Sequence, residues 1–291
     1  MLKAIDIIFV KKLYMICFPN AKINLGLDVI SRRSDGYHNI ETIFYPINLK
    51  DGLEIVNSTS EEEYKFHQTG NEIEGDPSNN LVIKAFKLIL NHSKSYIPNI
   101  DIHLLKKIPT GAGLGGGSSD AAFMLKLVND TFSLNISDKN LIKLASQIGA
   151  DCPFFLYNKP AYASGIGNML TPVDIDLSDR YILIVKPDIF ISTKEAYSMI
   201  SISKPTLSLK EIVKRPINEW KVLMKNDFEP PVFKKYPQIC KIKDQLYNQG
   251  AIYASMSGSG SSLYGIFNEK PDMHNLFNDH FTWLLSPDKT K

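Results

Sequence analysis

The 291-residue sequence has few cysteines, little net charge and no long hydrophobic run. Its three cysteines, Cys17, Cys152 and Cys240, are odd in number and widely spaced. This excludes a disulfide framework and a cysteine metal cluster, and favours a reducing compartment such as the cytoplasm. The formal net charge of +2 is too small to favour nucleic acid or a membrane surface as partner. No apolar run approaches the ~20 residues that span a bilayer. The composition is that of one large globular domain or two modest ones.

The first fourteen residues do not have the pattern of a secretory signal peptide. Their apolar run at residues 7–10 is short, Asp6 interrupts the apolar stretch, and two lysines follow where a cleavage site would stand. We therefore expect residues 1–14 to be an extension that the fold can lose, with Met15 as the functional start.

Glycine is scarce, at 17 of 291 residues, yet five glycines fall within residues 111–117. Glycine lets other atoms approach the main chain closely. The following residues, from Ser119 to about Phe132, have the apolar spacing of a helix with one buried face. Ser118 or Ser119 can cap this helix, and Asp120 lies in its first turn. A glycine loop that leads into a helix N-terminus predicts a phosphate site, with a flexible hinge as the alternative.

Three familiar phosphate-binding loops do not fit this stretch. The pattern G-x-G-x-x-G is present from Gly111 to Gly116, but no second buried strand with an acidic tip follows it. The lysine of a P-loop is absent after Gly117, and the HRD and DFG motifs of protein kinases are absent too. A phosphate site therefore remains the prediction, while the class of loop stays open on these motifs.

The coarse secondary structure indicates two α+β domains. Hydrophobic periodicity and turn residues favour an N-terminal domain of residues 15–162 and a C-terminal domain of residues 163–291. A helix begun by Asn79 or Asn80 and a helix capped by Ser137 belong to the first. The expected strands are 21–30, 45–57, 63–70, 100–105, 181–187, 251–256 and 262–267, with further helices at 137–149 and within 205–248.

Three polar features could face the glycine loop. Lys22 and Asn24 point the same way from an alternating strand, although such side chains usually lie on a solvated strand face. Asp151 stands at the edge of an apolar segment, where a carboxylate is costly to bury unless it is paired or functional; a capping aspartate is the alternative. Residues 255–262, SMSGSGSS, offer hydroxyl groups between two strands, or form a tight surface hairpin.

These features occur in an order that resembles the GHMP kinases, a family that includes galactokinase, homoserine kinase and mevalonate kinase. The order is Lys-x-Asn at 22–24, Pro-x-Gly-x-Gly-Leu-Gly-Gly-Gly-Ser-Ser at 109–119 and Ser-Gly-Ser-Gly at 257–260. The segment RSDGYH at 33–38 is most similar to members that phosphorylate the 2-hydroxyl of a cytidylyl-linked substrate. The resemblance covers residues 15 to about 267.

The resemblance implies a two-domain α+β fold of the GHMP kinase type, with the active site between the domains. It implies ATP and Mg²⁺, a small cytidylyl substrate, no nucleic acid or membrane partner, and a monomer or weak homodimer. Lys22 and Asp151 match the family's catalytic residues, with Asp151 as the base. The alternatives are a GHMP kinase acting on homoserine, mevalonate or galactose, a non-catalytic sensor on the same fold, and a dinucleotide-binding oxidoreductase.

The resemblance also implies the binding residues. Asn24 would lie beside the acceptor, Tyr37 and His38 would recognise cytosine, and Tyr197 would supply an aromatic ring on the other face of the base. Asn80 would lie near the adenine, and Ser118 or Ser119 near the magnesium. The loop that would hold the ATP phosphates consists of Pro109, Thr110, Gly111, Ala112, Gly113, Leu114, Gly115, Gly116, Gly117, Ser118 and Ser119.

Overall fold

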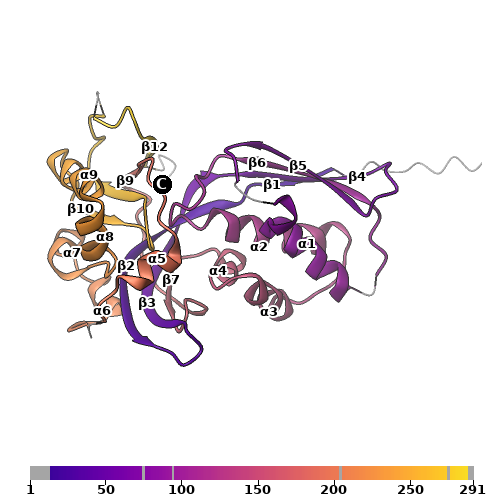
Figure 1. Cartoon of the computed structure of the whole chain (residues 1–291), viewed down its shortest axis with the longest axis horizontal. Coiled ribbons are helices and arrows are strands. Elements are labelled where there is room, and N and C mark those ends of the chain that lie inside the picture. Colours follow the sequence, from indigo (N-terminus) through magenta and orange to yellow (C-terminus); the bar gives the residue numbers. More distant parts are fainter. Residues whose placement is uncertain (1–13, 74–75, 94, 203–204, 274–275, 288–291) are drawn as a thin grey trace, which may run out of the picture.

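The structure is a computed structural model of the chain that describes residues 14–73, 76–93, 95–202, 205–273 and 276–287. The expected extension, residues 1–14, lies outside the described residues except for Tyr14, which begins the first strand. Within the described ranges the strands form three four-stranded sheets, arranged in an N-terminal and a C-terminal half with a long β-hairpin between them (Figure 1). Among these residues no helix has both the length and the apolar character that a membrane crossing requires.

The N-terminal half is a sheet with helices on one face. Strand β6 alternates buried and exposed residues, because successive side chains of a strand point to opposite faces. The buried face packs against α1 and α2. The elements are β1 (Tyr14–Cys17), β4 (Gly52–Asn57), β6 (Ile100–Lys106) and β5 (Tyr64–Gly70) in sheet order, with α1 (Leu81–His92), α2 (Gly116–Thr131), α3 (Asp138–Ile148) and a 3₁₀ turn (Pro77–Asn79).

The middle sheet connects the two halves. Its two long strands pair antiparallel, with a register shift at Gly26, which has a φ of +68°. The expected domain boundary after residue 162 falls inside β7, so that β7 and β8 continue the sheet of β2 and β3. A short helix, α4, packs its phenylalanines against this sheet. The elements are β2 (Asn20–Arg32), β3 (His38–Lys50), β7 (Ala161–Ser164), β8 (Met169–Pro172) and α4 (Cys152–Tyr157).

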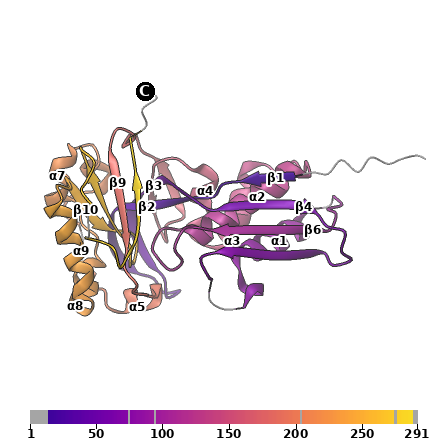
Figure 2. The same ribbon diagram turned by 90° about the horizontal axis from the view of Figure 1, so that it is seen from above.

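The C-terminal half is the third sheet, with helices on its outer face (Figure 2). Its strand β12 was not expected from the sequence, and it pairs antiparallel with β9 at the edge of the sheet. The elements are β10 (Tyr253–Met256), β11 (Leu263–Phe267), β9 (Tyr181–Lys186) and β12 (Phe281–Leu285) in sheet order, with α5 (Thr193–Ser198), α6 (Leu209–Ile212), α7 (Ile217–Leu223), α8 (Glu229–Lys235) and α9 (Pro237–Asn248).

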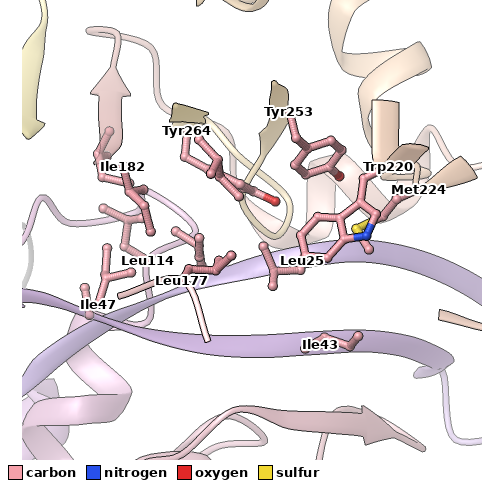
Figure 3. Packing of buried hydrophobic residues seen from close by; sticks show 14 of the residues in the cluster. Leu25, Ile43, Ile47, Leu114, Leu177, Ile182, Trp220, Met224, Tyr253 and Tyr264 are labelled. Carbon is pink, nitrogen blue, oxygen red and sulfur yellow. The ribbon is translucent and has the colours of Figure 1, made fainter. Parts of the chain in front are cut away.

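One hydrophobic core holds the hairpin and the C-terminal sheet together (Figure 3). Leu25 and Ile43 of the hairpin face Ile182 and Tyr264 of the C-terminal sheet, and Leu114 of the glycine loop lies among them. Burying a side chain of this size stabilises the fold by about 1.5–3 kcal/mol. The apolar residue of the glycine loop therefore anchors the loop where the two halves meet.

The helix after the glycine loop begins earlier than expected. It starts at Gly116 rather than Ser119, and its N-cap is Gly115, with a φ of +71°, in place of a serine side chain. Asp120 therefore lies one turn into the helix, where it is buried, and does not serve as the acidic residue of the first turn. The helix that follows Asn80 does begin as predicted, because the Asn80 side chain accepts a hydrogen bond from the Val82 N–H.

Candidate active site

The glycine loop has the backbone of an anion-binding site. Gly111, Gly113 and Gly115 have φ values of +58°, +74° and +71°, whereas the residues between them do not have positive φ. Such alternation turns successive N–H groups toward one side and forms an anion-binding concavity. Because α2 begins directly afterwards at Gly116, its unpaired N–H groups and dipole favour a phosphate at the same point.

Close packing around the loop explains why it needs glycine. A Cβ atom on Gly113 would lie 2.0 Å from the Ser257 carbonyl oxygen, and one on Gly116 would lie 2.9 Å from a methyl group of Ile108. The loop is therefore wedged between the C-terminal half and the end of β6. Side chains at these positions would collide with the protein itself, in addition to filling space that a ligand needs.

A cavity of about 760 Å³ opens beside the loop, within the usual range for a small-molecule site. Asn80 lines it and also caps α1 through the Val82 N–H at 2.9 Å. Leu114 and Ser119 do not line the cavity; Leu114 packs in the hydrophobic core between the two halves, and Ser119 is fully buried. The other expected ATP-binding residues line it: Pro109, Thr110, Gly111, Ala112, Gly113, Gly115, Gly116, Gly117 and Ser118.

Lys22 is buried, so a solvated strand face is the wrong interpretation of its strand. Its ammonium group donates hydrogen bonds to the Asn24 Oδ1 at 2.6 Å and to the Gly113 carbonyl at 2.9 Å. It also lies 3.5 Å from the Asp151 carboxylate, and its side chain is 4% exposed. The ring of Phe44 lies below the ammonium, 5.1 Å from it. The strand thus directs Lys22 and Asn24 to one point, and α4 covers that point.

Asp151 faces the same point from the start of α4. It occupies the N-cap position, but within the described chain its side chain makes no capping hydrogen bond. The carboxylate is 32% exposed, so it remains accessible to a ligand while it pairs with Lys22. Burial lowers the pKa of Lys22 below its ordinary value, and the Asp151 carboxylate opposes this change. The Lys22 ammonium and the Asp151 carboxylate therefore lie side by side, and Asp151 is not used to cap α4.

A second cavity, of about 470 Å³, contains this pair. Lys22, Asn24 and Asp151 line it, together with Tyr37 and Tyr197. The two cavities join at the glycine loop, because both are lined by Gly111, Gly113, Gly115, Ser118 and Thr193. The Lys22–Asp151 pair therefore lies in the second cavity, next to the loop that lines both cavities.

The aromatic residues expected to bind cytosine lie near one another. His38 stacks on Tyr197, with ring centroids 4.7 Å apart and planes 17° apart, so a base that stacks on Tyr197 must use the ring face that His38 leaves free. Burial and the neighbouring Arg32 lower the pKa of His38, which favours the neutral imidazole. Tyr37 is 61% exposed at the turn between β2 and β3, where its ring is accessible for stacking.

Sequence reasoning missed a buried charge cluster beneath the glycine loop. The Lys106 ammonium pairs with Asp51 and, at 2.8 Å, with Asp120, and the three side chains are 2%, 0% and 1% exposed. The other Asp51 oxygen accepts hydrogen bonds from the N–H groups of Lys107 and Ile108. The pKa of Asp120 is raised to about 7, because burial and the Asp51 carboxylate together outweigh the opposing effect of the Lys106 ammonium. The signal in the sequence was one charged residue, Asp120, directly before the apolar run of the helix.

The sequence predicted that the segment 255–262 either faces the glycine loop or forms a tight surface hairpin, and the surface hairpin is the wrong alternative. Ser257, Ser261 and Ser262 are all fully buried. The segment docks on the glycine loop, since the Ser262 N–H donates to the Ala112 carbonyl at 3.3 Å. Small residues are needed here because the backbone of this segment lies directly against the backbone of the glycine loop.

Comparisons with known proteins agree with this geometry. The model of the GHMP kinases N terminal domain matches residues 80–159, and that of the GHMP kinases C terminal domain matches residues 208–279. A 4-diphosphocytidyl-2-C-methyl-D-erythritol kinase of Parabacteroides distasonis is 57% identical, over 92% of this chain and 98% of its own. The kinase of that name from Bacteroides fragilis (strain ATCC 25285) is 54% identical, over 87% of this chain and 92% of its own.

Solved structures give the same result. A crystal structure of 4-(cytidine 5'-diphospho)-2C-methyl-D-erythritol kinase has a TM-score of 0.74 and 32% identity, covering 87% of this chain and 90% of its own. The mevalonate kinase of Methanococcus jannaschii, with a TM-score of 0.68 and 18% identity over 94% of this chain and 97% of its own, shares the fold. The chain therefore belongs to the GHMP kinase family.

Proposed function

We propose that the protein transfers the γ-phosphoryl group of ATP to the 2-hydroxyl of 4-diphosphocytidyl-2-C-methyl-D-erythritol, a step of the non-mevalonate route to isoprenoid precursors. The observation that carries the proposal is the Lys22–Asp151 pair, which lies where the glycine-loop cavity meets a second cavity lined by aromatic residues. The relatives at 54–57% identity carry the name of this kinase. The three free cysteines fit a cytoplasmic enzyme.

In this proposal the two cavities hold the two substrates. ATP occupies the larger cavity, with its phosphates on the N–H groups of the loop between Gly111 and Gly116 and its adenine toward Asn80. The acceptor occupies the smaller cavity, with its cytosine near Tyr37, His38 and Tyr197. Since the cavities share the glycine loop, the γ-phosphate and the acceptor hydroxyl meet beside Lys22 and Asp151.

The transfer step needs alignment and charge stabilisation more than covalent chemistry. The acceptor oxygen forms a bond to the γ-phosphorus while the bond from that phosphorus to the bridging oxygen breaks and ADP leaves. Asp151 accepts the proton of the hydroxyl, a form of help worth about 10²–10⁴-fold in rate. The Lys22 ammonium, held by Asn24 and Gly113, orients the carboxylate and stabilises the negative charge that develops.

Mg²⁺ belongs to the proposal as well. When bound, it would neutralise charge on the phosphates. Enzymes of this kind usually hold it through one or two carboxylates together with the phosphates and water, and in some phosphoryl-transfer enzymes a serine or threonine hydroxyl is a ligand. Of the two serines expected near the ion, Ser118 fits, because it lines both cavities. The Ser119 hydroxyl is buried and has no hydrogen-bond partner among the described residues, so we assign the ion to Ser118.

A coupled assay of ADP release tests the proposal across four acceptors: the cytidylyl substrate, homoserine, mevalonate and galactose. We expect release above the acceptor-free background only with the cytidylyl substrate, and mass spectrometry should find one added phosphoryl group on it. Turnover of another acceptor instead would show that the protein has the activity of a different GHMP kinase. Binding of both ligands without turnover would indicate a sensor.

A further inference from the structure

The Ser257 hydroxyl connects the C-terminal half to the residues around Lys22. This hydroxyl donates to the Gly113 carbonyl at 2.9 Å, and the Asn24 N–H donates to the hydroxyl at 3.3 Å. These partners lie 144 and 233 residues away in the sequence. The serine backbone is itself held, because its N–H donates to the Ser262 carbonyl and its carbonyl accepts from the Gly260 N–H. A rigid loop thus places one hydroxyl between β2 and the glycine loop.

Ser257 shares its acceptors with the catalytic lysine. The Lys22 ammonium donates to the Gly113 carbonyl and to the Asn24 Oδ1, and the Ser257 hydroxyl lies 2.9 Å and 3.4 Å from the same two oxygens. Without the hydroxyl, the Gly113 carbonyl keeps only the lysine as a side-chain donor among these groups, and the Asn24 N–H loses its acceptor. The Asn24 amide would keep its hydrogen bond to the Thr42 hydroxyl, but the Gly113 carbonyl and the Asn24 backbone would each lose a contact that fixes them beside Lys22.

The contact also fixes the direction of the loop peptides. In a trans peptide the C=O and N–H point in opposite directions. The Ala112 carbonyl accepts from the Ser262 N–H, and the Gly113 carbonyl accepts from Ser257. The N–H groups of Gly113 and Leu114 belong to the same two peptides, so they point away from the serine loop. Orientation of these donors therefore depends on the C-terminal half.

We infer that Ser257 is a positioning residue for phosphoryl transfer: its hydroxyl, through Gly113 and Asn24, keeps the Lys22 ammonium beside Asp151. This rests on the proposed function. The side chain does not touch the acceptor in this role, so its loss lowers the rate of transfer more than it weakens acceptor binding.

The experiment compares Ser257→Ala with Ser262→Ala. Both serines lie in one loop and are fully buried, and both changes remove one hydroxyl, but the Ser262 hydroxyl has no partner within the described residues. We expect Ser257→Ala to lower kcat about ten-fold, the scale of one lost hydrogen bond with its partner left unsatisfied. The KM of the acceptor should stay near the wild-type value, and Ser262→Ala should match wild type in both constants.

Each outcome decides the question. A wild-type kcat in Ser257→Ala, or an equal loss in Ser262→Ala, overturns the positioning role and leaves loop packing. If Ser257→Ala does not fold, Ser257→Thr and Ser257→Val replace it, since they differ only in hydroxyl against methyl; equal kcat values overturn the inference. Product analysis of the wild type tests the proposed function separately, and the ratio between variants can be measured with whichever acceptor the wild type uses.

Discussion

Replacing Lys106 by methionine should destabilise the protein strongly. The change keeps the length and apolar stem of the side chain but leaves Asp51 and Asp120, which are 0% and 1% exposed, without their counter-ion. Removing one partner of a buried ion pair costs about 3–5 kcal/mol, a large part of the 5–15 kcal/mol by which a domain is typically stable. Asp51 keeps its two N–H donors and Asp120 can take up a proton, so we expect the lower end, about 3 kcal/mol.

Thermal unfolding without nucleotide, followed by circular dichroism, measures this loss. At roughly 2–4 °C per kcal/mol for a chain of this order of size, Lys106→Met should melt about 6–12 °C below wild type. Lys107→Met is the matched control. The Lys107 side chain is next in sequence and exposed, and surface changes usually alter stability by no more than about 0.5 kcal/mol. The deficit of Lys106→Met should shrink at acidic pH, because the buried Asp120 carboxyl, whose pKa is already raised, then takes up a proton.

Equal melting temperatures for the two variants would refute the reasoning. The Lys106 cluster would then contribute no more to the free energy of unfolding than an exposed ion pair does. Leaving Asp51 and Asp120 buried without a counter-ion would then cost nothing measurable.

Three further predictions concern the catalytic base, the recognition of cytosine and the pH dependence of stability. Asp151→Asn should lower kcat by about 10²–10⁴-fold with ATP affinity intact by calorimetry; retention of more than about a tenth of the rate contradicts the base role. Tyr37→Ala should raise the KM of the cytidylyl substrate about ten-fold or more, and His38→Ala should remove the preference for the cytidine over the uridine form of the substrate. Neither change should alter the KM of ATP. If the constants for the cytidylyl substrate do not change, these residues do not recognise the base. Burial, then Asp227, raises the pKa of Asp28 from 3.8 to about 6, so ionisation of Asp28 costs stability increasingly as pH rises through that window. The melting temperature of Asp28→Asn should therefore rise relative to wild type between these pH values and keep that gain above them; a constant difference from acid to neutral pH would show that Asp28 does not titrate in this way.

Local stereochemistry made much of this protein predictable from sequence. Apolar spacing placed α1 and α3, and the Asn80 side chain does cap α1 as expected. The glycine cluster indicated a phosphate-binding loop before a helix, and the loop uses the positive φ that glycine adopts without cost at Gly111, Gly113 and Gly115. Motif order then pointed to the kinase family, which the comparisons confirm.

Tertiary packing decided what strand alternation could not. Alternation puts Lys22 and Asn24 on one face of β2, but it contains no information about what covers that face. Here α4 and the loop that carries Ser257 cover it, which turns a face that looked solvated into a buried site.

The charge cluster shows the same limit. Lys106 and Asp51 are 55 residues apart and come together because β4 pairs with β6, while Asp120 reaches them from α2. Sequence determines φ preferences and side-chain periodicity residue by residue, because these depend on neighbouring atoms along the chain. Desolvation and charge pairing depend on atoms brought from elsewhere in the chain, and only the folded arrangement decides which atoms those are.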